Sequence, residues 1–504
     1  MATTGHFRSV VWLRLIGATV LVFLLLVATG ILGKYYFNRF GQKIGPSIGR
    51  VMNSGVFRYL APITPLFALT FDGYLGVTAA LHPGVAGAIW SLVGLATIEA
   101  YSAGLCFRSM QTSAAEIPRP TLWRISWRGR RDSDIRLHRL LEVHVIYVIA
   151  PAVVAATVTW HEPVPAILSV LYLLRYLAFA LDFYDFEAVV HWHMHTRSLV
   201  VRGRPSASTF VQVMMNYVVG PINGYVPRLY ETEHMRLHHR YDSGPGDPYS
   251  PMPYRRTSLV EFSWFATRVV SSNLTAAAFL ASRRLSWRWR RLVSLNVLGY
   301  WLVVVVLIVA DRPLGVLLPI FAALHGVDQA KSQYKWHGLP DADNPKEPLG
   351  NTILWVASEA AWRTASGKVV LGEEIDLNDG FYRDWIYFDN YHLIHHLYPS
   401  AHFDRYLDLL RKSAPKILAS RAIVMTLPAI TSSVFDMWSA NVDALAQALL
   451  TEPPEGMDKR EFLRRRLEPV PEARHREALI FDSQPVRRLD AHLVRWLGFV
   501  TSGR

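Results

Sequence analysis

The chain has 504 residues, 51% of them hydrophobic, and a mean hydropathy of +0.17, which is too apolar for an ordinary soluble protein of this length. Its single cysteine, Cys106, excludes an internal disulfide framework, a cysteine-ligated zinc site and an iron–sulfur cluster held within the chain. The net charge of +13 suits an anionic membrane face or an acidic partner, and no stretch resembles a nucleic-acid-binding module.

Long apolar runs follow along the chain, and most are long enough to cross a bilayer core of about 30 Å as helices. They cover about 15–32, 59–81, 85–106, 143–160, 164–185, 292–310 and 313–330. All but the first form pairs, and each pair is joined by a short turn that contains proline, as in Asp311-Arg312-Pro313. The sequence therefore predicts a first span that is not removed as a signal peptide, followed by three helical hairpins.

Basic residues mark the side of the membrane on which the longer connections lie. Arginine and lysine gather in segments 33–58, 107–141 and 283–291. By the positive-inside rule these segments are cytoplasmic, and the hairpin turns face outward. We thus expect an all-α, multi-pass membrane protein.

Three histidine clusters lie next to predicted spans, in "HWHMH" at 191–195, "EHMRLHHR" at 233–240 and "YHLIHH" at 391–396. Residues three and four apart share a face of a helix, so each cluster can aim several imidazoles at one point. All three clusters fall on the predicted cytoplasmic side, which favours a metal site over unrelated structural histidines. Their members are His191, His195, His234, His238, His239, His392, His395 and His396.

Eight imidazoles exceed the four ligands that one zinc ion takes, and they suit two metal ions. Imidazole binds iron, zinc, copper and nickel. The Glu-x-x-His sets of soluble di-iron bundles are not visible in this sequence.

The order HxxxH, HxxxHH and HxxHH, interleaved with helical hairpins, resembles the integral-membrane fatty acid desaturase and hydroxylase superfamily. The resemblance covers roughly residues 140–405, and "HHRYDSGPGDPYSP" and "NYHLIHHLYPS" are similar to family segments around the second and third boxes. It implies a non-haem di-iron centre at the cytosolic face with eight or nine nitrogen ligands. The eight box histidines would then be ligands.

A ninth ligand of this family often lies at the cytosolic end of the last span. Two histidines are candidates here, His325 in "ALHGVDQ" and His337 in "YKWHGL". Position at the end of the predicted helix 313–330 favours His325, with His337 as the alternative.

Other groups near the boxes can orient the imidazoles by accepting their second N–H. The candidates are Glu187, Glu233, Asp247, Asp328, Asp389 and Asn390. His193 lies between two box histidines in sequence, but on a helix it points elsewhere.

The resemblance implies an O₂-dependent enzyme that acts on a lipid or acyl chain and draws electrons from an acidic carrier of the ferredoxin, rubredoxin or cytochrome b5 type. A fatty acid desaturase is the main interpretation. A hydroxylase or alkane-type monooxygenase is the alternative, because the same ligands serve both reactions. A divalent-metal transporter would place its site near the bilayer midplane, and a complete ligand set argues against an inactive scaffold.

The predicted organisation has three parts. Residues 1–140 form an N-terminal region of about three spans with a basic cytoplasmic loop, and 141–405 form the desaturase-like di-iron core with two transmembrane hairpins. Residues 406–504 form a cytoplasmic helical appendage. Two charges inside predicted spans, Glu99 and Arg175, are expected at similar depth and are hypothesised to pair.

Overall fold

The structure is a computed structural model and describes part of the chain. The described residues are 150–157, 159, 186–196, 205–244, 247–277, 280, 285–356, 362, 389–426, 433–473 and 484–502. The predicted spans 15–32, 59–81, 85–106 and 164–185 and the hypothesised Glu99–Arg175 pair lie outside them.

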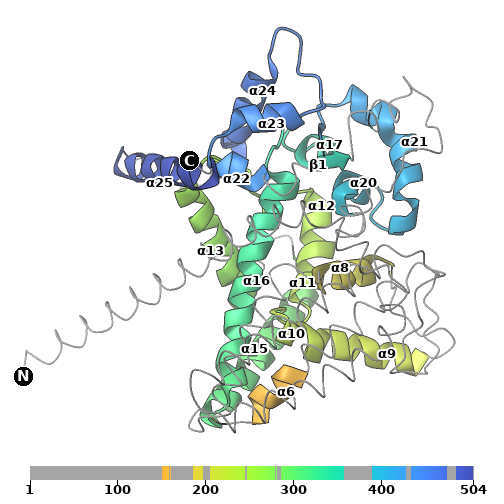
Figure 1. Cartoon of the computed structure of the whole chain (residues 1–504). Helices are drawn as coiled ribbons and strands as arrows, with labels where there is room; N and C mark the ends of the chain where they lie inside the picture. Colours follow the sequence, from red (N-terminus) through yellow and green to blue (C-terminus); the bar gives the residue numbers. More distant parts are fainter. Residues whose placement is uncertain are drawn as a thin grey trace, which may run out of the picture. The chain divides into compact units, whose positions relative to one another are not determined.

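Helices dominate the described chain, as the sequence predicts (Figure 1). The longer ones are α8 (Phe186–Thr196), α9 (Pro205–Met214), α13 (Leu259–Thr275), α15 (Trp287–Val309), α16 (Pro313–His337), α21 (Tyr406–Ala419) and α25 (Gln484–Ser502). Shorter ones are α6 (Ala150–Thr157), α10 (Gly220–Ile222), α11 (Leu229–Glu233), α12 (His239–Tyr241), α17 (Pro348–Asn351), α20 (His392–Leu397), α22 (Ser433–Trp438), α23 (Val442–Ala448) and α24 (Lys459–Leu467). Two π-helical turns, η5 (Met215–Val219) and η6 (His234–His238), interrupt the α-helical stretches around the second box. The 3₁₀ turns are η7 (Asp389–Tyr391), η8 (Phe403–Arg405) and η10 (Pro471–Ala473).

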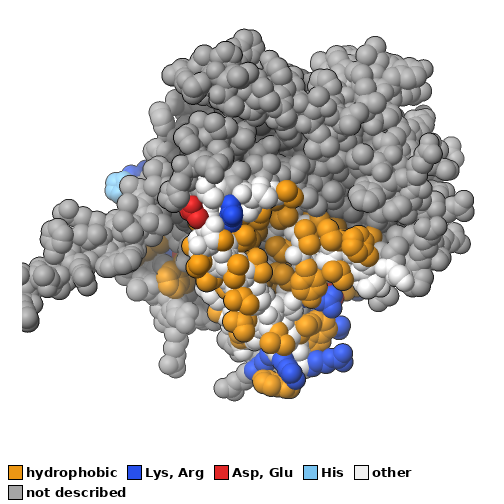
Figure 2. Space-filling model, turned by 90° about the horizontal axis from the view of Figure 1, so that it is seen from below, with side chains coloured by type: hydrophobic (Ala, Val, Ile, Leu, Met, Phe, Trp, Pro, Cys, Tyr) orange, Lys and Arg blue, Asp and Glu red, His pale blue; other side chains and the backbone are white. Residues whose placement is uncertain are grey.

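The apolar runs predicted at 292–310 and 313–330 are the helices α15 and α16, which follow each other across a short turn and pack together. Both are long and apolar enough to cross a membrane. Leu298 is 67% exposed and Val309 is 80% exposed on α15. A contiguous apolar face of this kind marks a surface that lies against lipid or protein. Figure 2 shows hydrophobic side chains gathered over the described part of this face.

Helix α16 is closely packed by the turn that follows α10. Gly224 in this turn has φ +86°, and a Cβ there would lie 2.8 Å from the Phe321 carbonyl carbon of α16. The position therefore needs both the left-handed backbone that glycine adopts freely and the absence of a side chain.

We expect Gly224→Ala to lower the free energy of unfolding by about 2 kcal/mol or more, because strain at positive φ adds to the overlap with α16. The measurement is thermal unfolding of the purified protein in detergent. Gly299→Ala on α15 is the matched control, because among the described residues no atom beyond its own turn of helix lies within 4 Å of a Cβ there. Equal melting temperatures for the two variants would contradict the packing described.

A small parallel sheet departs from the predicted all-α fold. Strands β1 (Ile353–Val356) and β2 (Ile423–Thr426) pair with Ile353 opposite Ile423. The strands are short runs, "ILWV" and "IVMT", and a buried apolar run of four residues carries no periodicity that distinguishes strand from helix.

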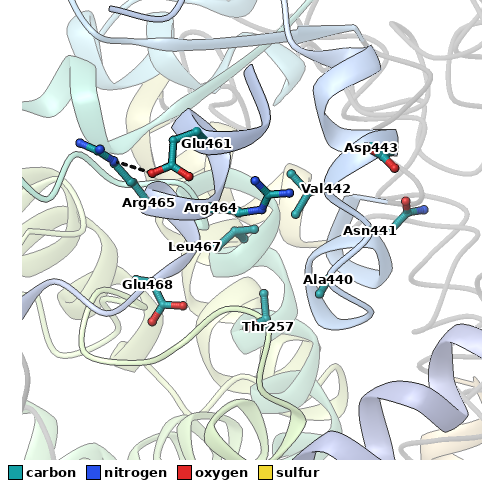
Figure 3. Close-up of a pocket in the computed structure, with 10 residues that line it drawn as sticks. All are labelled: Thr257, Ala440, Asn441, Val442, Asp443, Glu461, Arg464, Arg465, Leu467 and Glu468. Atoms are coloured by element: carbon teal, nitrogen blue, oxygen red, sulfur yellow. Dashed lines mark hydrogen bonds and ion pairs between the residues drawn. The ribbon is translucent and has the colours of Figure 1, made fainter. Parts of the chain in front are cut away.

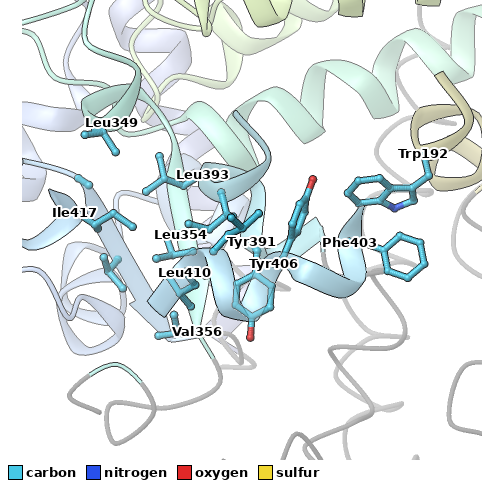
Figure 4. Close-up of a cluster of buried hydrophobic side chains, with 14 of the residues drawn as sticks. Trp192, Leu349, Leu354, Val356, Tyr391, Leu393, Phe403, Tyr406, Leu410 and Ile417 are labelled. Carbon is cyan, nitrogen blue, oxygen red and sulfur yellow. The ribbon is translucent and has the colours of Figure 1, made fainter. Parts of the chain in front are cut away.

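A buried hydrophobic cluster lies beside this sheet and joins the helices that carry the first and third histidine boxes (Figure 4). Trp192 of α8 packs its ring 5.4 Å from that of Tyr406 of α21. Leu393 and Ile394 of α20 are fully buried in the same cluster. The apolar residues within the boxes therefore anchor the helices, and the histidines between them are left to face the other way.

Two buried arginines join the C-terminal segment to the residues that follow α16. Arg466 of α24 donates to the carbonyl oxygens of Leu339, Gly350 and Arg421 at 3.1, 2.8 and 2.8 Å. Arg256 donates in turn to the carbonyl oxygen of Arg466 at 2.7 Å. Helix α24, within the predicted appendage, thus makes fully buried contacts with residues outside it.

Candidate metal centre

The histidine boxes come together in two clusters of buried and half-buried imidazoles. In each cluster the nitrogen atoms that face inward lie within 4.8 Å of one another. The first cluster contains His191, His195, His234, His239 and His395, and the second contains His238, His337, His392 and His396. All eight box histidines lie in one cluster or the other.

The first box owes its geometry to an ordinary α-helical turn. His191 and His195 lie four residues apart on α8 and share a face, with ring centroids 5.0 Å apart. The fully buried Trp192 fixes the rotation of α8 from another face, through its contacts with Phe403 and Tyr406. His193 lies outside both clusters.

The second box lies on a π-helical turn, and the wider turn explains how two of its three histidines meet. On an α-helix, residues five apart point about 140° away from each other. Hydrogen bonding to the fifth residue widens the turn, so that His234 and His239 face the same side. Their Nε2 atoms lie 3.0 Å apart. His238, between them in sequence, faces the second cluster.

The third box divides its histidines between the two clusters. His392 and His396 are one turn apart on α20, and both belong to the second cluster, with Nε2 atoms 3.2 Å apart. His395 turns toward the first cluster, where its Nε2 lies 2.9 Å from that of His191. A single short helix therefore holds the two clusters side by side, and the rings of His239 and His396 are 4.8 Å apart across them.

His337 joins the second cluster, and His325 does not. His337 is the last residue of α16, and its Nε2 lies 3.3 Å from that of His392. His325 lies twelve residues earlier, with its ring centroid 4.0 Å from that of Tyr225 and the two rings tilted by 37°. The Nε2 of His325 is buried without a hydrogen-bond partner within the described chain, and the residue belongs to neither cluster.

The nitrogen-to-nitrogen distances fit metal coordination. Two imidazole nitrogens bound at right angles to one ion at about 2.1 Å would lie about 3.0 Å apart. The Nε2 atoms of His195 and His234 are 3.0 Å apart, which is close to that spacing. Both clusters are made of imidazole alone, the ligand type suited to iron, copper, nickel or zinc.

Burial favours the neutral form of His191, His195, His234 and His392, which is the form that binds metal. Desolvation is the main cause that lowers the pKa of His191, His234 and His392 well below 6.5, and the neighbouring histidines lower it further. For His195, burial lowers the pKa to about 3. At neutral pH no proton therefore competes with a metal ion for these nitrogens.

The outward nitrogen of several ligand candidates is held by an oxygen. Asp247 contacts His238 Nδ1 at 2.7 Å, and Asp242 contacts His396 Nδ1 at 2.6 Å. The Tyr406 hydroxyl lies 2.8 Å from His395 Nδ1. Since Nε2 faces the cluster, we assign the proton to Nδ1, which donates to these oxygens and fixes the plane of each ring.

His337 is held in the same way by the main chain of the segment after α16. The carbonyl oxygen of Asn351 accepts from His337 Nδ1 at 2.9 Å. Asn351 is itself fixed, because its side-chain amide donates to the Pro345 carbonyl at 2.9 Å.

Of the groups predicted to orient histidines, only some contact one. Asp247 does, whereas Asp328 pairs with Lys331, and Asn390 donates to the Trp355 carbonyl at 3.2 Å. Glu233 accepts from Gln329 at 3.3 Å and lies near His238 and Asp247. The side chains of Glu187 and Asp389 are outside the described residues. Sequence reasoning missed Asp242, Tyr406 and the Asn351 carbonyl, for which no spacing rule exists.

A separate hollow lies away from the histidines, between α23, α24 and Thr257 (Figure 3). Its volume is about 560 Å³, and charged side chains such as Asp443, Glu461 and Arg464 line it. This charged lining does not suit an acyl chain, which needs apolar walls.

The fold and the site together define a mainly helical protein with two long apolar helices and two adjoining clusters of histidine. Residues 165–427, just over half of the chain, match the family model for fatty acid desaturases, and the chain belongs to this family. The family lies within the membrane fatty acid desaturase and hydroxylase superfamily, whose members are membrane-bound oxidoreductases. Searches of curated proteins and of solved structures gave no match.

Proposed function

We propose that the chain is a membrane-bound di-iron oxidoreductase that uses O₂ to desaturate a fatty acyl chain. The observation that carries this proposal is the pair of adjoining clusters, with nine imidazoles in total, of which seven are buried and two are half-buried. One zinc ion would use only four of these imidazoles as ligands, so the number present favours two metal ions. Family membership adds the acyl substrate class.

The proposed ligands of one iron are the five histidines of the first cluster. Those of the other iron are the four of the second cluster, so His337 takes the place of His325 as ninth ligand. The support for this exchange is the 3.3 Å distance from His337 to His392 and the hydrogen bond that holds its other nitrogen.

The chemistry that bound iron supplies is oxidation of an unactivated C–H bond with O₂. The chain's own residues prepare the place for it. The histidines present their Nε2 atoms inward, and Asp242, Asp247 and Tyr406 hold the rings of His396, His238 and His395 from behind. The buried cluster around Trp192 excludes water from one side of the first cluster.

The membrane position proposed for the centre follows from α16. At 1.5 Å per residue, a helix from Pro313 to His337 is about 37 Å long, so its last residues extend beyond a core of about 30 Å. The clusters then lie at the membrane surface, on the cytoplasmic side by the charge rule, where the acyl chain enters from the bilayer. We also propose the sequence-based division into 1–140, 141–405 and 406–504, with the C-terminus in the cytoplasm.

Electrons are proposed to come from an acidic carrier of the ferredoxin, rubredoxin or cytochrome b5 type. Arg236 and Arg240 are exposed on the stretch that carries the second box. Opposite charge on a carrier would steer it to this face and speed its docking.

The test of the proposed reaction is lipid analysis of an aerated host with and without the gene. We expect acyl chains with a new double bond, absent from a host that carries the His395→Ala variant. Hydroxylated chains would instead support the hydroxylase alternative, in which the same site returns oxygen to the substrate. No change in the acyl chains or alkanes of the host, with the protein present in its membrane, would contradict the proposal.

We expect Asp247→Asn to lower iron affinity by about 10–100-fold, because the carboxylate that fixes the His238 ring is lost. Competition with a chelator on the purified protein measures it. Asp343→Asn is the matched control, since this carboxylate is 78% exposed and pairs with Arg421 away from the clusters. Equal affinities in the two variants would remove Asp247 from the support of the centre.

A further inference from the structure

We propose that α25 is an interfacial helix that binds anionic phospholipid headgroups beside the cytoplasmic end of α16. The proposal rests on the membrane orientation given above and not on the metal.

The sequence of α25, "QPVRRLDAHLVRWLGFVTS", is amphipathic. Apolar residues recur every three or four positions along its described part and form one stripe, made by Val486, Leu489 and Leu493. Leu489 in this stripe is 55% exposed. Arg488 and Arg495 are exposed on another side of the helix. The described part of α25 therefore exposes both apolar and basic side chains.

The single acidic residue of α25 faces the protein. Asp490 accepts a hydrogen bond from the main-chain N–H of Val260, at the start of α13, at 3.2 Å. Helix α25 also contacts α22. Asp490 is the only carboxylate of α25, so basic residues outnumber acidic ones in this helix.

The depth of this anchor is set by α16. Tyr334 lies 21 residues after Pro313, or about 31 Å along the helix, which is the edge of a bilayer core of about 30 Å. Phe262, in the first turn of α13, packs its ring 5.1 Å from that of Tyr334. The attachment point at Val260 is therefore at the boundary between the apolar core and the headgroups. Figure 1 shows α25 lying crosswise to α16 beside α13.

An amphipathic helix held at this depth and lying crosswise to a span fits the headgroup region. The exposed Leu489 at the edge of the stripe can enter the outer acyl layer, while Arg488 and Arg495 reach phosphate groups. Each basic side chain near an anionic surface strengthens such binding. Phosphate on lipid is the partner that both the charge and the depth select.

The experiment measures hydrogen–deuterium exchange over residues 484–502 of the full chain in lipid nanodiscs. One set contains phosphatidylcholine alone, and the other contains three parts phosphatidylcholine to one part phosphatidylglycerol. We expect exchange in α25 to slow by about tenfold or more in the anionic discs. The double variant Arg488→Gln with Arg495→Gln should lose this difference.

The matched control is Arg464→Gln with Arg465→Gln, which removes the same charge from exposed positions on α24 (Figure 3). It should keep the difference between the two lipids. Equal exchange in both lipids, or an equal loss in the control, would overturn the proposal. His337→Ala should leave the lipid effect intact, which separates this test from that of the metal. A chain that fails to insert into either disc would overturn both the lipid site and the membrane orientation.

Discussion

The His337→Ala variant is expected to lose at least about 100-fold in activity and to bind less iron, because it removes a nitrogen directly from the second cluster. His325→Ala should keep its iron, since the His325 ring packs against Tyr225 and belongs to neither cluster. Iron content and turnover of the two purified variants measure the difference. This order is the reverse of the one that position at the end of the predicted span suggests.

Folding must be checked in both variants, because His337 is buried and His325 is half-buried. Thermal unfolding of the iron-free proteins provides this control, since it does not depend on the metal. Loss of iron in His325→Ala, with normal iron in His337→Ala, would contradict the assignment of the ninth ligand.

Arg466→Met is expected to lower the free energy of unfolding by about 3 kcal/mol or more. Burial lowers the pKa of this guanidinium to about 10, so it stays charged at neutral pH. Its loss leaves the buried carbonyls of Leu339, Gly350 and Arg421 without this donor, at about 1–3 kcal/mol for each left unsatisfied. Thermal unfolding measures the effect.

The neighbouring Arg465→Met is the matched control. Arg465 is exposed and pairs with the exposed Glu461 at 3.0 Å, as Figure 3 shows, and such surface pairs contribute about 0–1 kcal/mol. A similar loss in both variants would show that Arg466 does not join the C-terminal segment to the rest of the chain. Gly350 adjoins Asn351, whose carbonyl oxygen holds His337. We therefore also expect weaker iron binding in Arg466→Met and unchanged iron binding in Arg465→Met.

The sequence could predict the box histidines because their spacing is local. Four-residue spacing on α8 and on α20 places pairs of imidazoles on one face whatever the rest of the fold does. The division between two clusters was not predictable in this way. It depends on the π-helical turn at His234–His238, which no residue pattern announces, and on how α20 packs between the other elements.

Hydropathy favours His325 over His337 as the ninth ligand because it marks only the apolar part of a helix. Helix α16 continues beyond 330 through polar residues such as Lys331 and Gln333, and it ends at His337. The added turns come from packing against α13, where Phe262 and Phe265 contact Tyr334. Tertiary contacts of this kind are not visible in a window of apolar residues.

The groups behind the ligands were the least predictable part of the site. Asp242 lies 154 positions from His396 in the chain, and Asn351 acts through its main-chain carbonyl. Helix α24 is held by Arg466 through carbonyl oxygens, which every residue carries. Such contacts arise from the fold, and the composition of the tail, rich in arginine, glutamate and proline, suggested only a peripheral helix.

The most direct test of the di-iron centre is the metal content of the protein, purified from an aerobic host and active on an acyl substrate. Nine inward-facing imidazoles in two clusters lead us to expect close to two iron ions per chain, with zinc at trace level. One zinc ion per chain and no iron, in a preparation that still turns over substrate, would contradict the account.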